Sequence, residues 1–156
     1  MNIGMIVYSE TGHTLSVAVK LQQRLAAAGH QVALERLETV APLTMGATTA
    51  RLKSRPPIEP YDALVLGTPV RGGAPSPPMA AYLAQTPSLH GKRVALLVTG
   101  FFPYTWGRQQ TLARLKETCE AKGATVCGAG SVRWPSLTRR RQIAAAVDSL
   151  VRALEG

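Results

Sequence analysis

Residues 2–14 read Asn-Ile-Gly-Met-Ile-Val-Tyr-Ser-Glu-Thr-Gly-His-Thr, and this stretch decides the fold. The apolar run over residues 2–8 predicts a buried parallel strand, because a strand covered on both faces is hydrophobic almost throughout. The polar residues after it lead into a helix expected over residues 14–28, where apolar side chains recur at helical spacing and Gly29 ends the pattern. A strand, a polar loop and a helix therefore follow one another directly.

The same alternation continues to the end of the chain. Further strands are expected over residues 31–37, 63–67, 93–99 and 125–133, the last interrupted by glycines. Helices are expected near 42–53, over 76–84 and 108–122, and from Arg139 onward, where Ile143, Val147, Leu150, Val151 and Leu154 follow the helical period. Five strands alternating with helices predict an α/β fold, with one domain over residues 1–156 and a parallel sheet covered on both faces.

Composition supports one globular domain and excludes several classes of protein. The chain has 156 residues, of which 46% are hydrophobic and 17% charged, so a disordered chain is excluded. Cys119 and Cys127 are too few for a disulfide scaffold or a thiolate metal site, and we expect both in the core and no metal. No apolar run approaches the ~20 residues of a membrane span, and no signal peptide is visible. We expect a soluble, cytoplasmic protein.

The net charge of +9 is unevenly distributed along the chain. Residues 1–50 carry equal numbers of basic and acidic residues. Residues 51–100 carry six basic residues and two acidic ones, and residues 101–156 carry nine basic residues and four acidic ones. Two interpretations stay open: attraction of an anionic partner, such as an acidic redox protein, or a basic surface that aids solubility. Nucleic acid is not expected, because no basic run is interleaved with aromatic residues. Arg139, Arg140 and Arg141 are expected at the solvent side of a helix start.

The loop after the first strand has the composition of an anion site. In open parallel sheets, ligands bind beyond the carboxyl ends of the strands. Ser9, Thr11 and Thr14 offer hydroxyl groups there, and Gly12 lets the backbone come close to a ligand. A helix start presents free N–H groups and a positive dipole end, which suits a terminal phosphate. The alternative is ordinary helix capping by Ser9 or Thr11.

Two later loops follow strands that end at the same edge of the sheet. Residues 67–76 are rich in glycine and proline, so they either present a fixed backbone to the edge of a flat heterocycle or form an ordinary turn. Residues 99–107 hold half of the aromatic residues of the chain. These aromatics predict either a stacking wall for a planar ligand or a hydrophobic plug over the end of the sheet.

Together the three loops describe a site for flavin mononucleotide (FMN), and the chain resembles the flavodoxin-like family of FMN proteins. Ser9, Thr11, Gly12 and Thr14 match that family's Ser/Thr-x-Thr-Gly-x-Thr phosphate signature. The stretch Gly67-Thr-Pro-Val-Arg-Gly-Gly resembles a loop of its branch of NAD(P)H:quinone reductases. The resemblance implies a three-layer α/β/α sandwich with a five-stranded parallel sheet of order 2-1-3-4-5.

The resemblance also implies which residues would bind the cofactor. Side chains of Ser9, Thr11 and Thr14, with backbone N–H groups of Glu10, Gly12 and His13, would bind the phosphate. The ring would lie along Pro69, Val70, Arg71, Gly72 and Gly73. Its other border, and the ribityl chain, would meet Thr99, Gly100, Phe101, Phe102, Tyr104, Trp106 and Gly107. We expect the Glu10 side chain to point into water, and the Arg71 cation to favour the reduced, anionic ring.

The resulting functional hypothesis is an FMN-dependent oxidoreductase that passes electrons from NAD(P)H through flavin N5 to a small quinone-like acceptor. No catalytic acid, base or nucleophile is identified, and none is required. One alternative is a non-enzymatic electron-transfer flavoprotein that docks an acidic redox partner through its basic surface. Another is a fold that no longer binds FMN. The resemblance allows a homodimer, and Trp134 is either an interface or substrate-wall residue or an ordinary residue at the core edge.

Overall fold

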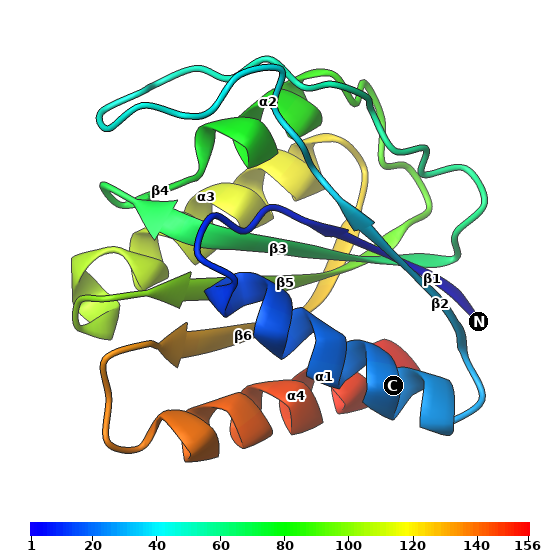
Figure 1. Cartoon of the computed structure of the whole chain (residues 1–156). Coiled ribbons are helices and arrows are strands. Elements are labelled where there is room, and N and C mark those ends of the chain that lie inside the picture. Colours follow the sequence, from blue (N-terminus) through cyan, green and yellow to red (C-terminus); the bar gives the residue numbers. More distant parts are fainter.

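Five parallel strands form the centre of the molecule, and helices cover both faces of the sheet (Figure 1). The computed structural model describes all residues from Met1 to Gly156. In chain order the elements are β1 (Asn2–Val7), α1 (His13–Ala27), β2 (Gln31–Arg36), β3 (Ala63–Arg71), β4 (Ala74–Pro75), α2 (Pro77–Ala84), β5 (Arg93–Gly100), the 3₁₀ helix η1 (Tyr104–Trp106), α3 (Arg108–Ala121), β6 (Thr125–Arg133) and α4 (Arg139–Glu155). None of these helices combines the length and the hydrophobicity that a bilayer crossing requires.

The order of the parallel strands is β2-β1-β3-β5-β6, which confirms the predicted order 2-1-3-4-5. Each neighbouring pair is parallel, with Val7 opposite Gly67 and Thr68 opposite Val98. The added element is β4, two residues that pair only with the end of β3 and run antiparallel to it. The connection after β1 leads to β2 at one edge of the sheet, whereas the connection after β3 leads toward β5 and β6 at the other edge. A crevice is expected between the carboxyl ends of β1 and β3, because the connections that leave them run in opposite directions.

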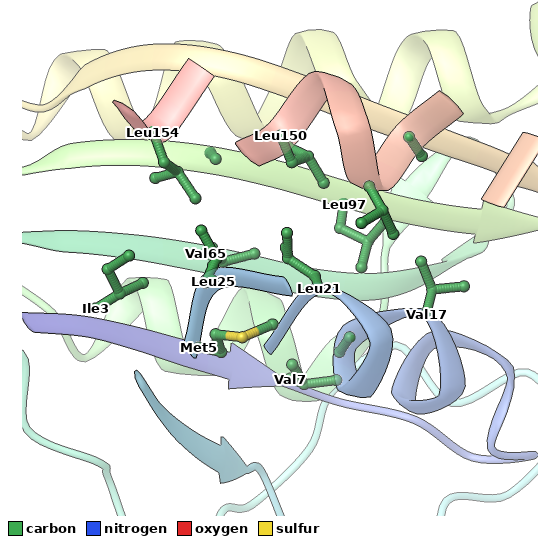
Figure 2. Packing of buried hydrophobic residues seen from close by; sticks show 14 of the residues in the cluster. Ile3, Met5, Val7, Val17, Leu21, Leu25, Val65, Leu97, Leu150 and Leu154 are labelled. Atoms are coloured by element: carbon green, nitrogen blue, oxygen red, sulfur yellow. The ribbon is translucent and has the colours of Figure 1, made fainter. Parts of the chain in front are cut away.

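The core consists of two hydrophobic clusters, one on each face of the sheet. On one face α1 and α4 pack on β1, β3 and β5, with Leu21 and Leu150 among the fully buried side chains (Figure 2). On the other face α2 and α3 cover the sheet. Cys119 lies in this second cluster, and burial raises the pKa of its thiol to about 11. Cys127 is partly buried against the first cluster, so both cysteines lie in or beside the core, as predicted.

Strand β6 departs from regular pairing at one point. Val126 pairs with Val94, but the next residue of β5, Ala95, pairs with Gly128. Cys127 is thus the extra residue of a β-bulge. Beyond the bulge, β6 lies close under α4, where a methyl group on Gly128 would come within 2.5 Å of the Ala153 Cβ. The glycines predicted to interrupt this strand therefore let α4 approach it closely.

The helix expected near residues 42–53 is absent, and that prediction is wrong. This stretch folds back on itself: Val40 N–H donates to the Arg51 carbonyl and Lys53 N–H to the Glu38 carbonyl, each at 2.9 Å. The sequence accounts for the difference, because Pro42 and Gly46 interrupt a helix and two adjacent threonines follow them. The connection between β2 and β3 therefore contains no helix.

Strand β3 is longer than predicted and ends in a hairpin. The loop expected from residue 67 begins only after Arg71, where Gly72 (φ 56°) and Gly73 (φ 75°) turn the chain into β4. Positive φ at both central residues is what a two-residue hairpin turn of type I′ requires. Pro69 fits within β3 because β1 ends opposite Gly67, which leaves β3 paired on one side only beyond that point.

Candidate functional site

The carboxyl ends of β3, β5 and β6 and the start of α1 lie at the same edge of the sheet (Figure 1). Residues of these elements and of the loops beside them form a cleft at this edge. It has two lobes, which share Val70, Gly100 and Phe101. The first lobe has about 510 Å³ of open space and is lined by Ser9, Glu10, Thr11, His13, Thr14, Pro69, Val70, Arg71, Thr99, Gly100, Phe101 and Trp134. The second has about 490 Å³ and is lined by Val70, Gly72, Gly73, Gly100, Phe101, Phe102, Pro103, Trp106, Gly107 and Arg108.

The structure brings together almost all of the residues that the sequence singled out. Of these, only Gly12 and Tyr104 do not line either lobe. Gly12 instead shapes the backbone at the start of α1, and Tyr104 contacts a residue of the second lobe, with the Arg108 guanidinium 5.4 Å from its ring centroid. The prediction omitted Pro103 and Arg108 and left the role of Trp134 open, and all three line the cleft.

The start of α1 offers bare backbone N–H groups to the first lobe. Gly12 caps the helix with φ 87°, a left-handed conformation that favours glycine, and no side chain caps the helix from this position. The N–H groups of residues 11–14 make no hydrogen bond within the protein, whereas Leu15 N–H donates to Ser9 Oγ at 3.3 Å. Capping by Ser9 thus satisfies one amide and leaves the preceding ones free. With no acidic residue in its first turn, this helix start suits an anion.

The hydroxyl groups around this helix start differ in their accessibility. Thr14 is 1% exposed, and its Oγ1 lies 2.8 Å from Thr99 Oγ1, which is also buried. One hydroxyl donates to the other, so the pair keeps one hydroxyl hydrogen for another acceptor. Ser9 is buried beside them, while Thr11 is exposed. The hydroxyl groups of this lobe are therefore neutral donors, and burial holds those of Ser9, Thr14 and Thr99 in place.

Glu10 is exposed at the surface, as expected, but its carboxylate is also paired with a cation. Its carboxylate accepts a hydrogen bond from the Arg71 guanidinium, and a weaker one from Tyr8 Oη at 3.4 Å. Burial raises the pKa of Tyr8 above its ordinary value, and the Glu10 carboxylate raises it further. The ion pair ties the loop after β1 to the hairpin at the end of β3. It also balances the charge of Arg71, so this cation is not free for a ligand.

A planar stack forms one wall of the first lobe. The His13 and Trp134 rings are nearly parallel, 12° apart, with their centroids at 4.1 Å, and the Arg139 guanidinium lies 4.7 Å from the Trp134 ring centroid. Burial lowers the pKa of His13 below its ordinary value, and the Arg139 charge lowers it further. His13 is therefore an uncharged ring at neutral pH, and Trp134 belongs to the cleft wall.

The aromatic loop after β5 stands in solvent. Phe102 is 64% exposed and Trp106 is 70% exposed, so the hydrophobic-plug alternative, which requires buried rings, is wrong. Two glycines of the second lobe let neighbouring side chains pack closely against the backbone: a methyl group on Gly107 would come within 3.0 Å of Val70 Cγ1, and one on Gly100 within 3.1 Å of Arg108 Cγ. The result is an open slot between the hairpin and the aromatic loop. An anion receptor beside such a slot fits a planar ligand that carries a phosphate.

No protein-family model matches the chain. Among curated proteins, an NAD(P)H dehydrogenase (quinone) of Gluconacetobacter diazotrophicus is 26% identical over 136 residues, covering 80% of this chain and 68% of that protein. One of Paraburkholderia phymatum with the same name is 36% identical over 92 residues, which cover 54% of this chain and 46% of the relative. The chain thus spans about half the length of this second relative.

Solved structures share the arrangement of the whole chain. Oxidised flavodoxin 2 of Bacillus cereus superposes with a TM-score of 0.71 at 20% identity, covering 97% of this chain and 99% of that one. A mutant flavodoxin of Fusobacterium nucleatum, bound to flavin mononucleotide, superposes with a TM-score of 0.66 at 14% identity, covering 97% and 95%. The strand order, the two layers of helices and these superpositions together give the chain a flavodoxin-like fold, which confirms at the level of fold the resemblance that its loops indicated.

Proposed function

We propose that the chain binds FMN and works as an oxidoreductase that passes electrons from NAD(P)H to a small quinone-like acceptor. The observation that carries this proposal is the set of unpaired N–H groups over residues 11–14, next to an open slot at the same sheet edge. These amides, with the Ser9 and Thr11 hydroxyls, would hold the phosphate. The hairpin over residues 69–73 and the aromatic loop would border the ring. FMN, when bound, supplies the hydride chemistry at N5.

The residues of the second lobe would orient the ring and leave one side of it reachable. Phe102 and Trp106 are exposed at the rim of this lobe, so a planar donor or acceptor can stack there without displacing buried parts of the protein. The chain offers surfaces and hydrogen-bond donors here, and the proposed reaction needs no separate catalytic acid or base. The curated relatives named NAD(P)H dehydrogenase (quinone) support this choice of donor and acceptor.

Flavin binding is tested by titrating the purified protein with FMN and, in parallel, with riboflavin, which lacks the phosphate. We expect FMN to bind at least tenfold more tightly. Thr11→Val should weaken FMN binding and leave riboflavin binding unchanged, and Thr11→Val/Thr14→Val should weaken it further. If the unaltered protein binds no FMN, or binds both flavins equally, the proposed phosphate site is wrong.

Electron transfer is tested with the flavin-loaded protein. We expect NAD(P)H oxidation that depends on an added benzoquinone and is absent without flavin. A second candidate, an electron-transfer flavoprotein that docks an acidic redox protein, is favoured by the exposed Arg139, Arg140 and Arg141 at the start of α4, next to the Trp134 wall. Quinone turnover at background, with reduction of an acidic redox protein that falls steeply as salt rises, would select this candidate instead.

A further inference from the structure

Arg108 is a buried cation that lines the second lobe of the cleft. It is the first residue of α3 and follows the aromatic loop directly. Only 7% of its surface is exposed, and the residue lines the second lobe. An arginine buried to this degree normally has a carboxylate partner, because removing its charge from water is costly.

The structure provides no such partner. The ion pairs of the protein join Arg24 to Asp148, His30 to Glu155, Lys53 to Glu38 and Arg71 to Glu10, and none includes Arg108. One Nη of Arg108 donates to Ser131 Oγ at 2.5 Å, while its Nε is buried with no partner at all. A hydroxyl oxygen satisfies one donor of the guanidinium but does not balance its charge.

The surroundings of Arg108 increase the free-energy cost of burying its charge. Arg108 occupies the first turn of α3, where the positive end of the helix dipole disfavours a cation, and no acidic residue lies in that turn. The positive charge of Arg133 is close enough to repel that of Arg108. Burial lowers the pKa of Arg108, and the charge of Arg133 lowers it further. The contact with the Tyr104 ring at 5.4 Å offsets only a small part of this cost.

A positive charge kept in this position at a cost to stability is explained if a negative charge appears in the lobe. We propose that Arg108 stabilises the negative charge that the flavin ring acquires on reduction. This inference rests on the proposed function. A hydride carries two electrons and one proton from NAD(P)H, which leaves as NAD(P)⁺, to the neutral ring, and the ring gains one net negative charge. The guanidinium of Arg108 supplies the opposite charge without a further proton.

Arg108 thereby takes the role that the sequence suggested for Arg71. Both arginines line the cleft, but Arg71 is neutralised by Glu10 and Arg108 has no carboxylate partner. A paired cation changes the potential of a nearby group less than an unpaired one, because the field of the carboxylate opposes its own. The two positions therefore make different predictions for the same measurement.

The test is a redox titration of the protein-bound flavin, combined with titration of oxidised FMN. We expect Arg108→Gln to lower the affinity for reduced FMN about tenfold more than the affinity for oxidised FMN. For a two-electron couple this lowers the midpoint potential by about 30 mV. Arg108→Lys, which keeps the charge, should recover most of the difference. Arg71→Gln should produce a smaller shift.

Ser131→Ala is the matched control, because it removes the hydrogen-bond partner of Arg108 and keeps the cation. We expect its midpoint potential to be unchanged. A midpoint potential that is the same in Arg108→Gln and the unaltered protein would overturn this inference and leave the proposed function intact. An equal loss of affinity for both flavin forms would also overturn it, because Arg108 would then be a general binding residue. If the unaltered protein binds no FMN, the proposed function fails, and this inference fails with it.

Discussion

Two helices begin at the cleft, and their first turns meet it in opposite ways. At α1 the chain presents Gly12, free backbone N–H groups and no charged side chain that lacks a partner. At α3 it presents Gly107 followed by Arg108, a full charge without a carboxylate. A phosphate carries its charge permanently, and partial charges suffice to hold it. A ring that becomes negatively charged only during the reaction is stabilised by a cation whose position is already fixed before the charge develops.

The largest effect is expected from a charge placed at the start of α1. Thr11→Glu puts a carboxylate beside the proposed phosphate. Two like charges ~4 Å apart repel each other by about 1 to 4 kcal/mol, depending on their exposure to water. We expect FMN affinity to fall on the order of 30-fold, with riboflavin affinity unchanged. Fluorescence titration measures both flavins, and Thr11→Gln is the isosteric control. A loss that is equal for the two flavins would show that the phosphate lies elsewhere.

Gly12 precedes α1 and Gly107 precedes α3, and each position requires glycine for a different reason. Combining each alanine variant with Val70→Ala distinguishes backbone strain from a side-chain clash. Gly12→Ala forces an alanine into a left-handed conformation, which costs about 1–2 kcal/mol wherever the methyl group points. Gly107 has extended backbone, so Gly107→Ala is destabilised through contact with Val70 Cγ1, on the order of 1 kcal/mol. In urea unfolding, Val70→Ala should restore stability to Gly107→Ala but not to Gly12→Ala. Rescue of both, or of neither, would contradict this distinction.

The unpaired cation at α3 should reduce the stability of the flavin-free protein. Arg108→Met removes the charge and keeps an apolar chain of similar length. Replacing buried charges by hydrophobic residues is often neutral or stabilising, so we expect the free energy of unfolding to be unchanged or higher by about 1 kcal/mol. Thermal unfolding without flavin measures the effect. Arg24→Met, which breaks an exposed ion pair, serves as the control. A marked loss of stability in Arg108→Met alone would identify Arg108 as a structural anchor.

The smallest effect concerns His13 at the α1 side. Its pKa in the folded protein lies below the ordinary value of 6.5, so the unfolded chain takes up this proton first as pH falls. Stability contributed by the neutral ring is therefore present above pH 6.5 and is lost as pH falls below it. His13→Asn should lack this part of the pH dependence. Bound FMN should weaken this pH dependence of stability, because a neighbouring phosphate favours the protonated imidazole of His13. A dependence unaffected by His13→Asn would assign it to other groups.

The sequence predicted the elements whose hydrophobic pattern is regular. Strand β1, with its continuous apolar run, and α4, with its apolar residues at helical spacing, lie where expected, and the strand order followed from the resemblance. The prediction failed where local composition and tertiary pairing disagree. Pro69 within β3 suggested a loop, but β5 pairs along this stretch. Around Pro42 no periodic signal was strong enough to choose between a short helix and a folded-back loop.

The lining of the candidate site could be predicted from neighbouring residues where its chemistry is local, but not where it depends on burial. A run of hydroxyls and a glycine between a strand and a helix marked the α1 side from neighbouring residues alone. The pairing of Glu10 with Arg71 joins two segments 61 residues apart, so no local pattern could indicate it. Arg108 could not be recognised as buried from its position after Gly107, because a single arginine at a helix start is usually exposed. The available signal was its placement at the wrong end of a helix dipole.

The bulge at Cys127 determines which side chains β6 offers to each layer of helices. Residues of a regular strand alternate between faces, and one extra residue reverses the alternation for everything that follows. Val126 packs on the α3 side, yet after the bulge Gly128, Gly130 and Val132 face α4. Ser131 is thereby turned toward α3, where it meets Arg108. If Cys127 instead paired with Ala95 and the strand continued without a bulge, the two faces beyond it would be exchanged. Ser131 would then enter the apolar layer beneath α4, and the guanidinium would lose its one hydrogen-bond acceptor.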